Sequence, residues 1–413
     1  MRLCIHRGAS EIGGTCIELE ARGRRLVLDV GLPLDVDPDE VALHPVPGFA
    51  AADSSLLGVL ISHGHLDHHG LARRLPPGTR FLIGRAAREI LAAAEVFSPA
   101  GIALENTVEL EDRRPLTLGP FTVTPFLVDH SAYGAHAALI EADGKRLFYT
   151  GDLRGHGRKA ALFERLVREP PRGVDLLLME GTTLGRPGSG RGFPTETALE
   201  ARLVALFSET PGMPLVWCSG QNIDRLVTVY RACKRSGREL IVDMYTAHVL
   251  RATGNPNIPR AEWDGVRVFL PASQRWRIIE RQAFEVSRLY QGRRIHREQL
   301  AGAAPRSVML FRPSMIRDVE QARCLEGARL VYSMWQGYLE RPEQRAFLDW
   351  LERRRMPLEV VHTSGHASVR DLVRLRRAFD GARVIPVHTA QPSRYRELFG
   401  DVTLLEDGRW LGV

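Results

Sequence analysis

The loop Ser62-His63-Gly64-His65-Leu66-Asp67-His68-His69 carries imidazoles and a carboxylate at a spacing suited to metal binding. It follows directly on the apolar residues 58–61, so the chain leaves a predicted strand where the loop begins. Alternate residues of an extended turn point the same way, which brings His63 and His65 together, while Asp67 and His68 reach a neighbouring position. A polar surface loop is the alternative, but such a loop has no need of imidazoles. The spacing predicts that one loop contributes to two metal sites.

Two metal ions need more ligands than one loop supplies, because zinc-like ions take about four ligands each. His130 follows the predicted strand 121–128, and Asp152 follows the predicted strand 146–150, where a carboxylate could bridge both ions. Taken singly, His130 is more often a structural histidine, and Asp152 a helix cap or turn residue. Their shared placement after strands favours the role of ligands.

The elements that must position these residues alternate between strands and helices. The first half predicts strands at 3–7, 14–19, 25–30, 57–61, 121–128, 137–141, 146–150 and 174–179, with a helix at 86–96. Each chemically suggestive residue lies just after the end of a strand. Sheets of α/β proteins gather their sites at the carboxyl ends of strands, so these side chains are expected to converge at one rim.

A Gly- and Pro-rich segment at 185–194 is a loop by composition and predicts a domain boundary. Beyond it, a helix at 197–209, a strand at 214–218, a helix at 223–236 and a strand at 239–243 form a βαβ series with its own parallel sheet. Further strands are predicted at 308–311, 330–333, 358–361 and 384–387. The order predicts one domain interrupted by another, with its last strands returning at the end.

The composition is that of a globular protein, and its basic charge favours an acidic partner. The 413 residues are 44% hydrophobic and 25% charged, with a net charge of +7 and a sequence pI near 9.4. Lysine occurs only at Lys145, Lys159 and Lys234, so an arginine bias from codon usage weakens the argument from charge. No apolar stretch approaches membrane-span length, and the five cysteines form no CxxC pair. These features predict core thiols and a soluble cytoplasmic protein without a membrane partner.

The His63-x-His65-x-Asp67-His68 motif resembles the signature of the metallo-β-lactamase superfamily. The resemblance implies two divalent metal ions, with zinc expected and manganese as the alternative. It also implies that Asp29 hydrogen-bonds the histidine loop and does not touch metal, although a turn aspartate is the alternative for this residue.

Three later features resemble one branch of that superfamily, the β-CASP nucleases, which include RNase J and the cleavage-and-polyadenylation endonucleases. Glu180 stands after a strand, His366 lies in His362-Thr363-Ser364-Gly365-His366-Ala367-Ser368, and His388 follows the strand 384–387. The resemblance implies that His388 completes the second metal site. It also implies that His366 contacts the scissile phosphate and assists the leaving oxygen, with Glu180 orienting it. The segment Cys218-Ser219-Gly220-Gln221-Asn222-Ile223 resembles the serine-rich turn of the inserted domain.

The resemblance extends over essentially the whole chain and implies its fold. We expect an α/β protein in which a metallo-β-lactamase αββα sandwich, residues 1–190 and 358–413, is interrupted by an α/β β-CASP domain with a mostly parallel sheet, residues 191–357. The expected activity is two-metal hydrolysis of phosphodiester bonds, with Asp67 accepting a proton from the attacking water and His366 protonating the leaving oxygen. The small residues Ser364, Gly365, Ala367 and Ser368, with His366, could seat a phosphate.

Single-stranded RNA is the favoured substrate, because a histidine at the His388 position resembles the RNA-cutting members. DNA remains an alternative substrate. A thioester or lactone hydrolase is one rival, since the histidine loop occurs throughout the superfamily. A catalytically silent RNA-binding subunit is another, because some members of the branch have lost ligands. The chain ends soon after His388, which leaves no room for the additional domain linked to dimerisation in RNase J. Oligomeric state, homodimer included, and end preference therefore stay open.

A basic stretch at 275–297 interleaves arginines with aromatic residues. It contains Arg275, Arg277, Arg281, Arg288, Arg293, Arg294 and Arg297 together with Trp276 and Tyr290. Charge and stacking of this kind could follow a single nucleic-acid strand. An arginine-covered amphipathic helix is the equal alternative.

Overall fold

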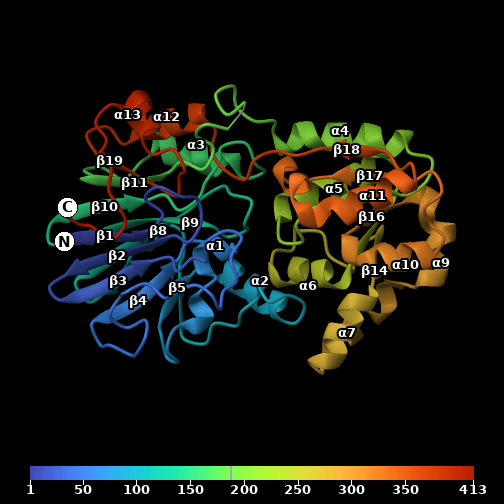
Figure 1. The fold of residues 1–413 in the computed structure, drawn as a ribbon, viewed down its shortest axis with the longest axis horizontal. Helices are drawn as coiled ribbons and strands as arrows, with labels where there is room; N and C mark the ends of the chain where they lie inside the picture. The colour runs from blue at the N-terminus through green and yellow to red at the C-terminus, as the bar shows by residue number, and fades with distance from the viewer. Residues whose placement is uncertain (187) are drawn as a thin grey trace. The chain divides into compact units, whose positions relative to one another are not determined.

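The computed structural model describes residues 1–186 and 188–413, which form two compact units (Figure 1). Unit 1 comprises Met1–Leu91, Ile102–Phe193 and Gly365–Val413, and unit 2 comprises Ala92–Gly101 and Pro194–Ser364. The units begin and end near the domain limits of 190 and 357, which remain a prediction. No helix within the described residues is long and apolar enough to cross a membrane.

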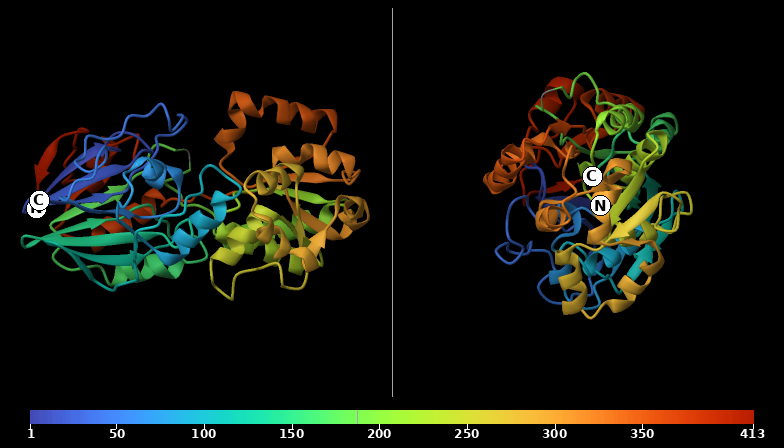
Figure 2. Two further views of the ribbon diagram at one scale, coloured as in Figure 1. Left: turned by 90° about the horizontal axis from the view of Figure 1, so that it is seen from below. Right: turned by 90° about the vertical axis from the view of Figure 1, so that its right-hand side faces the viewer.

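The first sheet of unit 1 has seven strands in the order β20-β1-β2-β3-β4-β5-β6. Their bounds are β1 Arg2–Arg7, β2 Cys16–Ala21, β3 Arg24–Leu28, β4 Leu56–Ile61, β5 Phe81–Ile83, β6 Thr107–Glu109 and β20 Trp410–Gly412. Strands β3 to β6 run parallel, whereas β1 pairs antiparallel with both β2 and β20. The first and last strands therefore lie side by side, and both ends of the chain meet at one edge (Figure 2).

The second sheet of unit 1 has six strands in the order β19-β11-β10-β9-β8-β7. Their bounds are β7 Leu116–Leu118, β8 Phe121–Leu127, β9 His136–Ala142, β10 Lys145–Tyr149, β11 Leu176–Glu180 and β19 Arg383–Val387. Strands β10, β11 and β19 run parallel to one another. Their carboxyl ends therefore lie together, at Tyr149, Glu180 and Val387.

The two sheets of unit 1 pack face to face with helices on their outer sides. In β3, Leu26 and Leu28 join the core between the sheets, while Val27 joins an outer cluster that includes Leu91. This alternation is the period of two that strand geometry requires. The helices of unit 1 are α1 Leu66–His69, α2 Arg85–Glu95, which runs across the division into unit 2, α3 Ala160–Arg168, α12 Val369–Ala378 and α13 Arg394–Phe399. Residues of α3, α12 and α13 cover the outer face of the second sheet, which confirms the predicted αββα sandwich.

Unit 2 contains one sheet in which every pairing is parallel, as predicted for the second half of the chain. The order is β15-β14-β13-β16-β12-β17-β18, with bounds β12 Pro214–Trp217, β13 Glu239–Asp243, β14 Val266–Phe269, β15 Arg294–Ile295, β16 Ser307–Leu310, β17 Arg329–Tyr332 and β18 Leu358–Val360. The α-helices of unit 2 are α4 Glu196–Glu209, α5 Ile223–Arg235, α6 Met244–Ala252, α7 Ala272–Glu280, α8 Phe284–Arg288, α9 Arg297–Ala303, α10 Ile316–Gln321 and α11 Arg345–Arg353. Strand β18 pairs with β17, so residues 358–360 extend the sheet of unit 2.

The five cysteines lie in the interiors of the two units. All five are buried and none forms a disulfide within the described residues. Burial raises the pKa of Cys4 to about 11, which keeps this thiol protonated near neutral pH. The thiols are therefore core residues, as the sequence predicts.

Candidate metal centre

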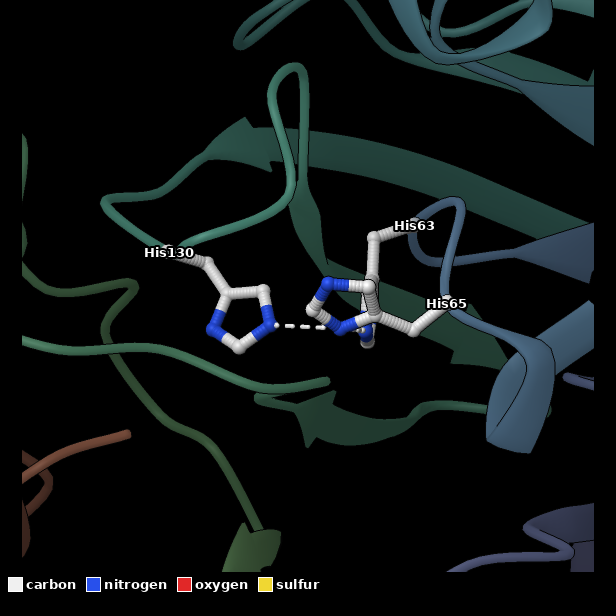
Figure 3. Close-up of side chains that lie close together, drawn as sticks. All are labelled: His63, His65 and His130. Carbon is white, nitrogen blue, oxygen red and sulfur yellow. Dashed lines mark hydrogen bonds between the residues drawn. The ribbon is translucent and has the colours of Figure 1, made fainter. Parts of the chain in front are cut away.

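Three histidines of unit 1 converge at the end of β4. His63 and His65 lie in the turn after β4, and His130 lies in the loop after β8. His63 Nε2 is 3.1 Å from His65 Nδ1, and His130 Nε2 is 3.2 Å from the same atom (Figure 3). Figure 3 shows the three rings turned toward one point from two separate loops. The structure therefore brings together the three residues that the sequence places after two different strands.

The hydrogen bonds of the Nδ1 atoms determine which ring nitrogens can bind a cation. His130 Nδ1 is 2.6 Å from the carbonyl oxygen of Gly365, which can only accept, so Nδ1 carries the proton. The Ser62 hydroxyl donates to Asp29, and its oxygen therefore accepts from His63 Nδ1 at 3.0 Å. In neutral His63 and His130 the Nε2 atoms are then unprotonated. His65 Nδ1 can donate to at most one of these two lone pairs, so the arrangement suits a cation between the three rings.

A second group of ligand atoms lies beside the first. His68, Asp152 and His388 bring one atom each within 4.8 Å of one another, and Asp67 forms a similar group with His63 and His68. His388 Nε2 is 3.5 Å from Asp67 Oδ2. His68 Nε2, His388 Nε2 and both carboxylate oxygens of Asp152 are buried without a hydrogen-bond partner among the described residues. Burying such atoms is costly unless a ligand satisfies them.

Asp152 lies at the centre of both groups. Its Oδ2 atom is 3.7 Å from His63 Nε2, 3.2 Å from His68 Nε2, 3.9 Å from His130 Nε2 and 3.8 Å from His388 Nε2. Ligand atoms about 2.1 Å from a tetrahedral zinc ion are roughly 3.4 Å apart, so these separations suit metal coordination. A carboxylate between two sets of imidazoles is also the group best placed to bridge two ions. The donor set of nitrogens and carboxylate oxygens fits divalent cations.

Burial and the neighbouring carboxylates tune the charges of these side chains. Burial lowers the pKa values of His63, His65 and His130, which keeps these imidazoles in the neutral form that binds metal. For His68 burial acts in the same direction, but Asp152 and two other carboxylates raise its pKa well above the usual value. The surroundings of His68 therefore favour a positive charge at this point.

Asp29 stabilises the histidine loop through hydrogen bonds. Its Oδ1 accepts a hydrogen bond from the Ser62 backbone N–H at 2.7 Å. Its Oδ2 accepts from the Ser62 hydroxyl at 2.7 Å, from the Tyr149 hydroxyl at 2.6 Å and from His68 Nδ1 at 2.8 Å. The last bond fixes the proton on Nδ1 and leaves His68 Nε2 to face Asp152. Asp29 is fully buried and belongs to none of the groups that could hold a metal, which suits a supporting role.

Replacing Asp29 by asparagine is expected to weaken metal binding by about 10- to 100-fold. Three donors converge on Asp29 Oδ2. An asparagine side chain whose oxygen accepts from Ser62 N would place its own NH₂ donor group against these three donors. The dissociation constant for zinc, measured by competition with a chromophoric chelator, checks this. Tyr149→Phe is the matched control, because it removes one donor and keeps the carboxylate. Equal affinity in Asp29→Asn and wild type would contradict the supporting role.

The backbone beneath the loop is packed closely enough to fix Asp67 and His68. The Thr15 N–H donates to the Asp67 carbonyl at 3.1 Å, and the Val30 N–H donates to the His68 carbonyl at 2.9 Å. A Cβ atom on Gly31 would lie 1.8 Å from the Asp67 carbonyl oxygen, so only glycine permits this approach. Local packing therefore fixes the backbone positions of Asp67 and His68, from which their side chains extend.

Glu180 and His366 lie next to the ligand groups. His366 Nδ1 is 3.4 Å from Glu180 Oε2 and 3.5 Å from Asp152 Oδ2. Burial opposes a positive charge on His366, but the Glu180 and Asp152 carboxylates outweigh it and raise its pKa. Glu180 is itself fixed, because its two carboxylate oxygens accept from Leu153 N at 3.1 Å and from Thr182 N at 3.2 Å. The His366 side chain retains 18% exposure, whereas that of Glu180 retains 1%.

Comparison with known proteins finds the same superfamily in part of the chain. Residues 24–201 match the model of the β-lactamase superfamily domain. This segment is a metallo-β-lactamase superfamily domain. Curated relatives named ribonuclease J support the β-CASP branch of this superfamily. A domain of this superfamily implies binding of divalent metal.

The similarity to these relatives is modest in extent. Ribonuclease J of Helicobacter pylori strain 26695 is 25% identical over 240 residues, which are 54% of this chain and 33% of the relative. Ribonuclease J of Mycobacterium tuberculosis strain H37Rv is 27% identical over 260 residues, which are 58% of this chain and 44% of the relative. The match thus spans between a third and a half of the length of these relatives.

A solved structure has a similar fold over nearly the whole length of this chain. A protein of unknown function from Enterococcus faecalis V583 superposes with a TM-score of 0.81 and 22% identity. The superposition covers 99% of both chains. It supports the architecture described above.

Residues of the segment 364–368 make structural contacts with other parts of the chain. The Gly365 carbonyl accepts from His130, and the Ala367 carbonyl accepts from the Thr183 hydroxyl at 2.6 Å. The Ser368 hydroxyl accepts from Asp371 N at 3.2 Å and so begins helix α12. Ser364 is the last residue of unit 2, and His366 is the residue of this segment beside the ligand groups. A phosphate-binding role for the segment stays a prediction.

Several supporting residues of the site are not among the residues that the sequence motifs single out. Thr15 lies 2.8 Å from His388 Nδ1 through its hydroxyl, and the buried Arg154 donates to Asp129 Oδ1 at 3.3 Å. Asp129 also accepts from Gly157 N at 2.7 Å, so it anchors the loop that follows Asp152. The position of Asp129 beside His130 was a usable signal for its role. Nothing local to Thr15 connects it with a histidine 373 positions later.

Proposed function

We propose that this chain is a two-metal-dependent nuclease that hydrolyses phosphodiester bonds of single-stranded RNA. The observation that carries the proposal is the position of Asp152 Oδ2, which lies from 3.2 to 3.9 Å from nitrogens of His63, His68, His130, His366 and His388. A buried carboxylate among so many imidazoles suits a bridge between two cations. Unsatisfied buried atoms on Asp152, His68 and His388 support the same view.

The ligands divide between two ions. One ion would take His63, His65 and His130, the other would take Asp67, His68 and His388, and Asp152 would be shared. Zinc suits this donor set, and manganese is the alternative. Bound divalent ions would supply a water of lowered pKa and neutralise negative charge that develops on a phosphate.

The chain's own residues then handle protons and orientation. Asp67, whose side chain is 17% exposed, would accept a proton from the attacking water. His366 would protonate the leaving oxygen, a task for which imidazole is well matched near neutral pH. Glu180 would orient His366, because both of its oxygens are fixed by backbone N–H groups and Oε2 faces His366 Nδ1 at 3.4 Å.

RNA is preferred as substrate for two reasons. The curated relatives that match this chain are named ribonuclease J. The net charge of +7 also favours a polyanion. Single-stranded DNA and small thioesters or lactones are the alternatives that an experiment must separate.

The proposal is tested by incubating the full chain with zinc or manganese and end-labelled RNA that carries a 5′-monophosphate or a 5′-triphosphate. We expect metal-dependent products from RNA, loss of these products in EDTA, and little turnover of a matched DNA strand or a generic thioester. The order in which products appear gives the end preference. Turnover of the thioester alone would reject the nuclease, and cleavage of DNA alone would reject RNA as substrate. Binding of less than one metal ion per chain would favour a silent RNA-binding subunit.

A further inference from the structure

Helices α7 and α8 of unit 2 present large apolar side chains to solvent. Trp276 is 56% exposed, Ile279 55%, Phe284 46% and Leu289 49%. These four residues lie within one short stretch of sequence, whereas single exposed apolar side chains elsewhere need no explanation. An exposed apolar cluster of this kind marks an interaction surface.

Helix α7 is fixed to unit 2 by its opposite side. Gln274 Oε1 accepts from the Tyr245 N–H at 3.0 Å, and Gln274 Nε2 donates to Asp243 Oδ1 at 3.0 Å. Ile278 is also buried, with 3% exposure. Figure 1 shows α7 projecting from the body of unit 2. The face that carries Trp276 and Ile279 is therefore held outward by contacts on the other face.

The same surface is basic. Arg275, Arg281 and Arg288 are exposed, and their guanidinium groups form no hydrogen bond or ion pair within the described part of the chain. Arg277 is 5.1 Å from the Trp276 ring centre and pairs with Glu280 at 3.1 Å. Unpaired guanidinium groups in the same stretch of sequence as exposed rings favour an anionic, aromatic partner.

In the structure, only part of the basic stretch at 275–297 is exposed and available for binding. Tyr290 has 1% exposure and its hydroxyl lies 3.2 Å from His248 Nδ1, so its ring cannot stack on a base. Arg293 donates to the Glu262 carbonyl at 3.0 Å, and Arg297 donates to Gln321 Oε1. The prediction for Tyr290 is wrong because the ring packs inside unit 2. The available surface is formed by Arg275, Trp276, Ile279, Arg281, Phe284 and Arg288, which we call the α7–α8 surface.

We propose that the α7–α8 surface is an accessory binding site for single-stranded nucleic acid, an inference that rests on the proposed function for the choice of RNA. Exposed bases would stack on Trp276 and Phe284, and the three unpaired arginines would contact the phosphates. Duplex RNA would bind less well, because its bases are already stacked. A second copy of the chain is disfavoured as partner, since it would bring the same unpaired arginines against this surface.

The test measures binding of a fluorescent 20-nucleotide oligouridylate to the full chain by anisotropy, with His366→Ala added to every protein to slow cleavage while metal stays bound. One variant is Trp276→Ala with Phe284→Ala, and another is Arg275→Gln, Arg281→Gln and Arg288→Gln. The matched control is Arg323→Gln, Arg353→Gln and Arg355→Gln, which removes three exposed arginines of unit 2 outside this surface. We expect the ring variant to raise Kd by about 10-fold or more. The arginine variant should lower the slope of log Kd against log salt by about 2, because each phosphate contact on a single strand contributes about 0.7.

Three outcomes would overturn the proposal. The first is a Kd for both surface variants equal to that of wild type or of the control. The second is a change of oligomeric state in the ring variant by light scattering, with unchanged affinity for oligouridylate. The third is tighter binding to anionic phosphatidylglycerol vesicles than to the oligonucleotide. Hydrolysis of bis(p-nitrophenyl) phosphate distinguishes failure of the accessory site from failure of the proposed nuclease. The surface variants should retain this hydrolysis. If wild type lacked it, that result would count against the nuclease alone.

Discussion

Asp152→Ala is expected to abolish phosphodiester hydrolysis, with kcat/KM at least ~10³-fold below wild type. The reason is the central position of its carboxylate, which lies 3.2 Å from His68 Nε2 and 3.7 Å from His63 Nε2 and so serves both ligand groups. Without it, each group loses an anionic ligand and the imidazoles lose the charge that favours a cation. Initial rates on labelled RNA and metal content by mass spectrometry measure the two effects together.

RNA affinity should remain largely intact in Asp152→Ala, because the proposed contacts with the strand are made by other residues. Asp175→Ala is the matched control, since it removes a carboxylate that precedes β11 and accepts from Arg146 N at 2.8 Å. His65→Ala and Asp67→Ala should also abolish cleavage, each through one of the two ligand groups. Wild-type rates in all three ligand variants would remove the basis for the site assignment.

His366→Ala is expected to slow the chemical step on RNA by about 10²- to 10⁴-fold while leaving metal content unchanged. The leaving oxygen of RNA is strongly basic and needs a proton, which His366 would supply. An ester with p-nitrophenol as leaving group needs no such proton. The same variant should therefore hydrolyse bis(p-nitrophenyl) phosphate at close to the wild-type rate. Single-turnover kinetics on both substrates measure the difference.

Loss of metal from His366→Ala would show that His366 acts as a ligand, as its grouping with His130 and Asp152 also permits. Equal losses on RNA and on the activated ester would likewise contradict proton donation. Glu180→Gln is the companion variant, because it keeps a side chain of the same size beside His366. It should show a smaller loss on RNA than His366→Ala and none on the activated ester.

Convergence of the candidate ligands could be predicted from the sequence where the signal is local. His63, His65, Asp67 and His68 lie in one short loop, and His130, Asp152 and His388 each follow a strand whose apolar pattern is readable. Because parallel strands end at the same rim, the order of apolar strands and polar residues is enough to predict that these side chains converge. The αββα sandwich follows from the same alternation of apolar residues.

Other features depend on contacts between distant segments and left no trace in the sequence. The Tyr149 hydroxyl completes the environment of Asp29 from 120 positions away. Strand β18 is short, with Leu358 and Val360 exposed, so its pattern did not indicate the sheet to which it adds. Strands of three residues such as β5 and β7 are too short to show a period. Burial of Tyr290 likewise follows from packing in unit 2.

The residues around Asp152 come from the ends of strands in both sheets of unit 1, and from both the early and the late parts of the chain. A bound cation would therefore act as a cross-link that closes very long loops, in the way that a disulfide restricts an unfolded chain. Metal binding at the centre and the stability of the sandwich would then be thermodynamically linked. A chelator that removes the cation would weaken the packing of the two sheets as well as stop the proposed hydrolysis.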